Sequence, residues 1–216
     1  MLNIGVLASG RGTNLQSIID ACHSGLIHAE VTAVLSDNRD AYALERARSH
    51  GINAYHVEAA DQRSHEEDLS RLLQENEVTL VVGAGYMRIL SPSFVRQWEG
   101  RLINIHPALL PSFRGTDGQG DALDYGVKIS GCTTHFMDER PDHGPVILQA
   151  AVRVHEHDDR ESLAQRILQV EHQLLPRSID LFEQGRLKIE GRRVRILPGD
   201  SWMDRALPHV LYAEGF

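Results

Sequence analysis

The sequence predicts an α/β fold in which a doubly wound, mostly parallel sheet is followed by antiparallel strands. In the first half of the 216 residues, short β-like runs alternate with amphipathic helical patterns, as in repeated βαβ units. In the second half, the β-like runs 129–137 and 146–154 flank a loop, which is typical of an antiparallel pair. Since no repeat, low-complexity segment or linker interrupts the chain, we expect residues 1–216 to form one domain.

The first half predicts a regular alternation of strands and helices. The run 79–84 (Thr-Leu-Val-Val-Gly-Ala) is almost continuously apolar, as expected for a strand covered on both faces. In the helix before it, Leu69, Leu72 and Leu73 fall on one face. The expected strands are 3–8, 31–36, 54–57 and 79–84, and the expected helices are 14–22, 41–50 and 64–76.

The second half predicts longer and more varied elements. A helix capped by Ser91 precedes a fifth parallel strand at 102–106, and the antiparallel pair follows. A long helix is expected at about 159–184, because its apolar residues recur at helical spacing. The runs 187–189 and 194–196 predict a hairpin, and the tail 197–216 has no assignable pattern. The apolar stripe of the long helix is Leu163, Ile167, Val170, Leu174, Ile179 and Phe182.

Composition and the start of the chain favour a cytoplasmic protein. The formal net charge of −8 argues against broad nucleic-acid binding, although a few backbone N–H groups can still hold a small anion. The start of the chain lacks a basic n-region, and no apolar run approaches the ~20 residues of a membrane span. Cys22 and Cys132 are too few for a disulfide framework or a zinc site, so we interpret both as buried thiols and expect no metal.

The segment Ser-Gly-Arg-Gly-Thr-Asn-Leu at 9–15 joins the first strand to the first helix. Its glycines allow a tight turn, and the N–H groups at the helix start can hold a phosphate. It is a poor dinucleotide fingerprint, because Leu15 stands where a third glycine is required. The alternative is a glycine turn in which Thr13 or Asn14 merely caps the helix. The position of the segment at the carboxyl end of a sheet strand favours phosphate binding.

Asn104 and His106 lie on one face of the fifth strand, because side chains alternate with period two. A histidine at a strand end can exchange protons near neutral pH, and Asp142, in the loop Pro-Asp-His-Gly-Pro, can return a carboxylate to it. This combination suggests chemistry at a carbonyl carbon. The alternative is a structural histidine beside Pro107.

Two further segments allow more than one interpretation. The apolar residues of 84–90 can line a pocket for a flat ligand, but the pattern alone favours core residues at the start of the Ser91-capped helix. The basic residues of the C-terminal hairpin are interpreted as an exposed face. They are Arg186, Lys188, Arg192, Arg193 and Arg195.

Four segments together resemble the phosphoribosylglycinamide formyltransferases, which are folate-dependent enzymes of purine biosynthesis with a Rossmann-like fold. The resemblance covers about residues 3–189. The matching segments are Ser-Gly-Arg-Gly-Thr-Asn-Leu, Ala-Gly-Tyr-Met-Arg-Ile-Leu-Ser-Pro, Asn-Ile-His-Pro-Ala-Leu-Leu-Pro-Ser-Phe and Asp-His-Gly-Pro-Val-Ile-Leu-Gln.

The resemblance implies substrates and residue roles. The substrates are glycinamide ribonucleotide and 10-formyltetrahydrofolate as co-substrate, without a metal, in a monomer or homodimer. Asn104, His106 and Asp142 match the catalytic trio. The implied ribonucleotide contacts are Gly12, Thr13, Asn14 and Glu171. The implied folate contacts are Arg63, Met87, Arg88, Ile89, Leu90, Asn104, Asp138, Glu139, Arg140, Pro141 and Asp142.

The sequence also departs from this family. The loop 114–121 carries Arg114 where many relatives have proline, and it lacks their histidine, so its contacts cannot be assigned. Arg63 is only the nearest match to a basic folate contact. The rival interpretations are a formyltetrahydrofolate deformylase, whose family carries an extra N-terminal domain, and a non-catalytic folate- or nucleotide-binding protein. A methionyl-tRNA formyltransferase would need a further C-terminal domain and a basic face.

Overall fold

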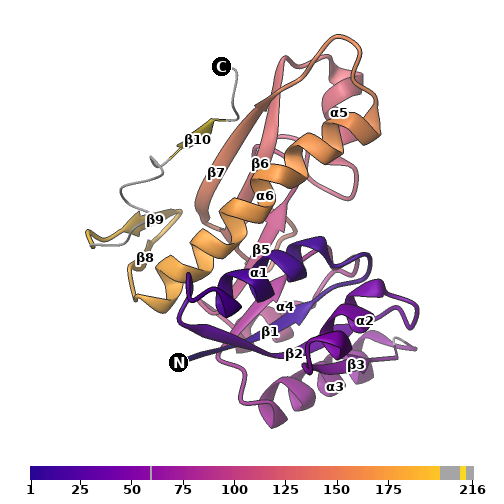
Figure 1. Cartoon of the computed structure of the whole chain (residues 1–216), viewed down its shortest axis with the longest axis vertical. Helices are drawn as coiled ribbons and strands as arrows, with labels where there is room; N and C mark the ends of the chain where they lie inside the picture. Colours follow the sequence, from indigo (N-terminus) through magenta and orange to yellow (C-terminus); the bar gives the residue numbers. More distant parts are fainter. Residues whose placement is uncertain (59, 200–209, 213–216) are drawn as a thin grey trace.

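The computed structural model describes residues 1–58, 60–199 and 210–212 of the chain. Helices and strands alternate through the first half, as the sequence predicts (Figure 1). The helices are α1 (Thr13–His23), α2 (Tyr42–Ser49), α3 (Gln62–Glu75), α4 (Pro92–Gln97), α5 (Gly118–Tyr125) and α6 (Arg160–Glu183). The strands are β1 (Leu2–Leu7), β2 (Ala29–Ser36), β3 (Asn53–His56), β4 (Leu80–Gly83), β5 (Leu102–His106), β6 (Ile129–Phe136), β7 (Val146–Arg153), β8 (Leu187–Glu190), β9 (Arg193–Ile196) and β10 (Val210–Tyr212).

The strands form one sheet in the order β3-β2-β1-β4-β5-β6-β7-β9-β8, with β10 paired to β7. The first five strands are parallel, and β6 is antiparallel to both β5 and β7. The predicted fold class is therefore confirmed. Because β1 lies between β2 and β4, the chain winds outward in opposite directions from this point. Such a reversal opens a crevice at the carboxyl ends of the strands, where α/β sheets bind ligands.

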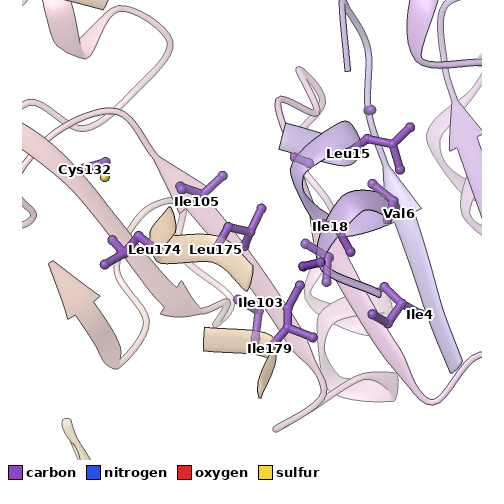
Figure 2. Packing of buried hydrophobic residues seen from close by; sticks show 14 of the residues in the cluster. Ile4, Val6, Leu15, Ile18, Ile103, Ile105, Cys132, Leu174, Leu175 and Ile179 are labelled. Carbon is purple, nitrogen blue, oxygen red and sulfur yellow. The ribbon is translucent and has the colours of Figure 1, made fainter. Parts of the chain in front are cut away.

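Two apolar layers cover the sheet. On one face, α1, α2 and α6 pack against it, and Figure 2 shows Leu15 and Ile18 of α1 and Leu174 and Ile179 of α6 beside the strands. On the other face, α3 and α4 form a second cluster with the sheet. Cys132 is buried, as expected, whereas Cys22 is only half-buried. The burial of both faces explains why the central strand β4 (Leu-Val-Val-Gly) has no polar side chain.

Two elements were not predicted from the sequence. Helix α5 lies in the segment with the unassigned loop, where Gly118 and Gly120 lower helix propensity and the side chain of Asp117 caps the helix by accepting from the Gly120 N–H. Strand β10 lies in the unassigned tail. In the part of the chain that the structure describes, no helix is long and apolar enough to cross a membrane.

Candidate active site

A cavity of about 320 Å³ lies at the carboxyl ends of β1, β4 and β5. Asn104, His106 and Asp142 all line it, so the predicted trio meets in one place. The other predicted residues in its lining are Asn14, Met87, Arg88, Ile89, Leu90, Asp138, Glu139, Pro141 and Glu171. Gly12, Thr13, Arg63 and Arg140 are not part of the lining. Among the described residues, no group of three or more His, Cys, Asp or Glu is placed to hold a metal ion.

His106 is buried at the end of β5, and both ring nitrogens have neighbours. Nε2 lies 2.8 Å from the carbonyl oxygen of Phe113. Because a carbonyl only accepts, Nε2 carries a proton and donates it to this bond. Nδ1 lies 3.6 Å from Oδ1 of Asp142. The ring is therefore held by the hydrogen bond of Nε2, while Nδ1 lies near the carboxylate of Asp142.

Asp142 is held by the loop whose contacts the sequence could not assign. The backbone N–H of Gly115 donates to Oδ2 of Asp142 over 3.0 Å. Asp142 and Gly115 both have a positive φ, 49° and 105°, and for the aspartate this is an uncommon backbone conformation. The segment Phe113–Gly115 thus holds both the histidine and the aspartate of the trio, one by a carbonyl and the other by an amide.

A second histidine, which sequence reasoning missed, orients Asn104. His135 lies opposite Asn104 in the antiparallel ladder of β5 and β6. Its Nδ1 donates to the Phe136 carbonyl over 3.0 Å, and burial lowers the pKa of His135, so the ring is neutral near pH 7. Nε2 is then an acceptor, and the Asn104 side-chain amide donates to it over 3.2 Å. The second hydrogen of that amide is left for a ligand.

The glycine loop after β1 turns its carbonyl groups toward α2. The N–H of Ala43 donates to the Gly10 carbonyl over 3.0 Å, and Nε of Arg46 donates to the Arg11 carbonyl over 2.9 Å. Gly12 is the N-cap of α1 at φ 69°, and a Cβ there would approach Ala43 to 2.8 Å. The alternative that Thr13 or Asn14 caps the helix is therefore wrong, since no side chain caps α1.

Glu171 and Asn14 form a buried polar pair between α6 and α1. The amide of Asn14 donates to Oε2 of Glu171 over 2.7 Å. Burial raises the pKa of Glu171, and the bond from Asn14 offsets only part of this effect. Oδ1 of Asn14 is buried without a hydrogen-bond partner. The pair is thus a polar group in the cavity wall with unused hydrogen-bonding capacity, as expected of a ligand contact.

The segment after β4 lines the cavity, and the core interpretation was wrong for two of its residues. Met87 and Ile89 are 65% and 70% exposed, whereas Leu90 is buried as a core residue. Ser91 caps α4, as predicted.

Arg63 lies in the first turn of α3. Its side chain is exposed and forms an ion pair with Glu67 of the same helix.

The C-terminal hairpin is not simply an exposed basic face. Arg186 is buried and donates to the Leu197 carbonyl over 2.8 Å, and Arg192 donates to the backbone carbonyl of His143. In turn, Nδ1 of His143 lies 2.6 Å from a carboxylate oxygen of Asp138, which lines the cavity. The hairpin tip therefore contacts the loop that carries Asp142.

Comparison with known proteins decides the family. Residues 2–179 match the family model described as formyl transferase. Over 216 residues the chain is 42% identical to the phosphoribosylglycinamide formyltransferase of Escherichia coli (strain K12), and the match covers 98% of this chain and 99% of that relative. The chain belongs to the phosphoribosylglycinamide formyltransferase family.

Solved structures of higher sequence identity agree with this membership, and a deformylase is more distant. The glycinamide ribonucleotide transformylase 1 of Symbiobacterium toebii is 49% identical, with a TM-score of 0.90 over 92% of this chain and 95% of that one. A formyltetrahydrofolate deformylase from Pseudomonas syringae is 29% identical, with a TM-score of 0.86, and this chain covers 66% of it.

Relatives also occur inside longer proteins. The chain is 44% identical over 187 residues to the trifunctional purine biosynthetic protein adenosine-3 of Drosophila melanogaster but spans only 14% of its length.

Proposed function

We propose that this formyltransferase moves the formyl group of 10-formyltetrahydrofolate to the amine of glycinamide ribonucleotide. The observation that carries the proposal is the meeting of Asn104, His106 and Asp142 in one cavity. The same cavity is lined by the Asn14–Glu171 pair and by the exposed side chains of Met87 and Ile89. Polar groups suited to a ribonucleotide and apolar groups suited to a pterin are thus available beside the trio.

The proposed reaction is direct attack of the amine on the formyl carbon. A bond forms between the amine nitrogen and that carbon, and the bond from the carbon to N10 of the folate breaks. Between these events the formyl oxygen carries negative charge. Asn104 is the donor for this oxygen, because its second amide hydrogen is free while the first is held by His135.

His106 and Asp142 are proposed to handle the protons of this reaction. The amine must lose a proton and N10 must gain one, so the net change is a proton relay. His106 keeps one proton on Nε2 for the Phe113 carbonyl, and Nδ1 is the nitrogen that can accept or deliver the second. The Asp142 carboxylate, 3.6 Å away, attracts the imidazolium that forms in the relay.

The substrate contacts are proposed from the same geometry. Gly12, Thr13 and Asn14 begin α1, whose unpaired N–H groups suit the ribonucleotide phosphate. Glu171 is the contact for the sugar hydroxyls, because its buried carboxylate keeps acceptor capacity. The folate contacts are proposed to be Met87, Arg88, Ile89 and Leu90 with the loop Asp138, Glu139, Arg140, Pro141 and Asp142, all of which except Arg140 line the cavity. Arg63 is kept only as a contact for the outer part of the folate, since its side chain lies outside the cavity lining.

We further propose one domain over residues 1–216 that acts in the cytoplasm on small molecules and binds no nucleic acid. The continuous sheet joins the strands of both halves, which supports the single domain. The net charge of −8 supports the absence of nucleic-acid binding, because the phosphate backbone requires a basic face.

The decisive comparison is with formyltetrahydrofolate deformylase, which passes the formyl group to water. Purified protein with 10-formyltetrahydrofolate should form tetrahydrofolate only when glycinamide ribonucleotide is present. The rate is followed by absorbance with and without the acceptor. Equal rates with formate release would instead assign a hydrolase, and ligand binding without turnover would assign a binding protein.

Glu171→Gln should weaken ribonucleotide binding but stabilise the free protein. The loss of a charged hydrogen-bond acceptor should raise the KM for the ribonucleotide about tenfold to a hundredfold, from about 1.5–3 kcal/mol. At pH 7 the folded wild type bears the cost of a buried carboxylate, because burial raises the pKa of Glu171 above its unfolded value. The variant should therefore melt higher at pH 7, and the difference should vanish as the pH falls and the carboxyl group protonates. An equal melting difference at pH 4 and pH 8 would refute the electrostatic explanation.

A further inference from the structure

Ser9 lies where the carboxyl ends of three parallel strands meet, and it does not line the cavity. It follows β1 at the start of the glycine loop. Its hydroxyl donates to Oδ1 of Asp37, just after β2, over 2.6 Å. The backbone N–H of Met87, after β4, donates to the same hydroxyl over 2.9 Å. One side chain thus connects the proposed phosphate-binding loop to the proposed folate-binding segment.

The donor and the acceptor of each hydrogen bond in this chain can be assigned. An ionised carboxylate only accepts, so the single hydroxyl hydrogen of Ser9 points to Asp37. A lone pair is then left for the Met87 N–H. The backbone of Ser9 is also engaged, because its N–H donates to the Gly85 carbonyl over 3.0 Å and its carbonyl accepts from Asn38 over 3.2 Å. Ser9 therefore has little freedom to move independently of its neighbours.

The segment after β4 is held at its far end by α3. The side chain of Gln62 donates to the Ile89 carbonyl over 2.8 Å, and the carboxylate of Glu66 accepts from the Ser91 N–H over 2.6 Å. These contacts come from a helix that carries no proposed ribonucleotide contact. The Ser9 contacts at the near end are different, because they come from the loop proposed to hold the ribonucleotide phosphate.

We propose that Ser9 is a positioning residue that couples the two substrate-binding segments. The inference rests on the proposed function. When the ribonucleotide fixes the glycine loop, Ser9 fixes the Met87 backbone, and the ordering needed to bind the folate is partly complete. Folate binding then costs less, which appears as a coupling free energy between the two ligands, and the effect is reciprocal.

The test measures tetrahydrofolate binding to the full chain by calorimetry, with and without saturating glycinamide ribonucleotide. In the wild type, the ribonucleotide should tighten tetrahydrofolate binding by at least about fivefold, the lower end of typical coupling. Ser9→Ala should reduce this factor to near one, with a raised KM for the formyl folate and a smaller change in kcat. Ser9→Thr keeps the hydroxyl and should retain the coupling. Ser49→Ala is the matched control, since this exposed serine bonds only within its own helix turn.

A second variant tests whether the Asp37 and Met87 contacts of Ser9 act together. Asp37→Ala should reduce the coupling as Ser9→Ala does. The double variant should show no further loss, because both changes break the same chain of hydrogen bonds. Additive losses would overturn the proposal, as would an absence of coupling in the wild type or unchanged coupling in Ser9→Ala. Formyl transfer by the same wild-type preparation distinguishes the two failures. Transfer without coupling removes only this inference, whereas the absence of transfer removes the proposed function as well.

Discussion

Asp142→Asn is expected to lower kcat by about 10²–10⁴-fold, the range of general acid–base catalysis, with little change in the KM for the ribonucleotide. The substitution keeps the size of the side chain, and an asparagine oxygen can still accept from the Gly115 N–H. What disappears is the negative charge 3.6 Å from Nδ1 of His106. The imidazolium that forms during the proton relay then loses its counter-charge.

The matching experiment is steady-state kinetics of Asp142→Asn, His106→Ala and the double variant. Because the two groups act as a unit, each single variant should be strongly impaired and the double variant little worse. Asp124→Asn is the control, because it makes the same substitution at an exposed aspartate of α5. A kcat near that of the wild type in either single variant would remove the assigned roles.

Asn104→Ala is expected to lower kcat by about 10²–10³-fold, as measured for lost donors to a developing oxyanion. The amide is aligned before substrate arrives, because neutral His135 accepts one of its hydrogens. Gly83 supports the same alignment. A Cβ at that position would lie 2.7 Å from Oδ1 of Asn104, so Gly83→Ala should displace the amide and reproduce part of the loss.

Kinetics with both substrates saturating distinguish this role from a binding role. Loss of an interaction made only in the transition state lowers kcat and kcat/KM together, whereas loss of binding raises KM alone. Asn53→Ala, at an asparagine of β3 far along the sheet, should leave both constants unchanged. If Asn104→Ala raised KM with kcat intact, the amide would be a substrate contact and not the oxyanion donor.

The placement of Asn104 and His106 was predictable from general rules of strand and sheet geometry. Asn104 and His106 share a face by the period of a strand, and parallel strands bring their carboxyl ends to one edge. The antiparallel pairing of β6 and β7 was also predictable from two β-like runs around a short loop. In both cases the pattern within the strands themselves predicts the arrangement.

The supporting residues were not predictable, because they depend on contacts between distant parts of the chain. His135 reaches Asn104 only through the register of β5 against β6, which no local pattern specifies. The Gly115 amide reaches Asp142 across 27 positions, from a loop whose contacts the sequence did not specify. The sequence pattern alone did not predict the exposure of Met87 and Ile89, for another reason. Their apolar character suits a core and a ligand pocket equally, and only the cavity distinguishes the two.

The most direct test of the central claim follows a labelled formyl group. Wild-type protein is mixed with 10-formyltetrahydrofolate carrying a ¹³C formyl carbon and with glycinamide ribonucleotide, and the products are identified by NMR. Direct transfer predicts that the label appears in the amide of the formylated ribonucleotide, with tetrahydrofolate formed in equal amount. Label recovered as formate, at a rate independent of the ribonucleotide, would contradict the account.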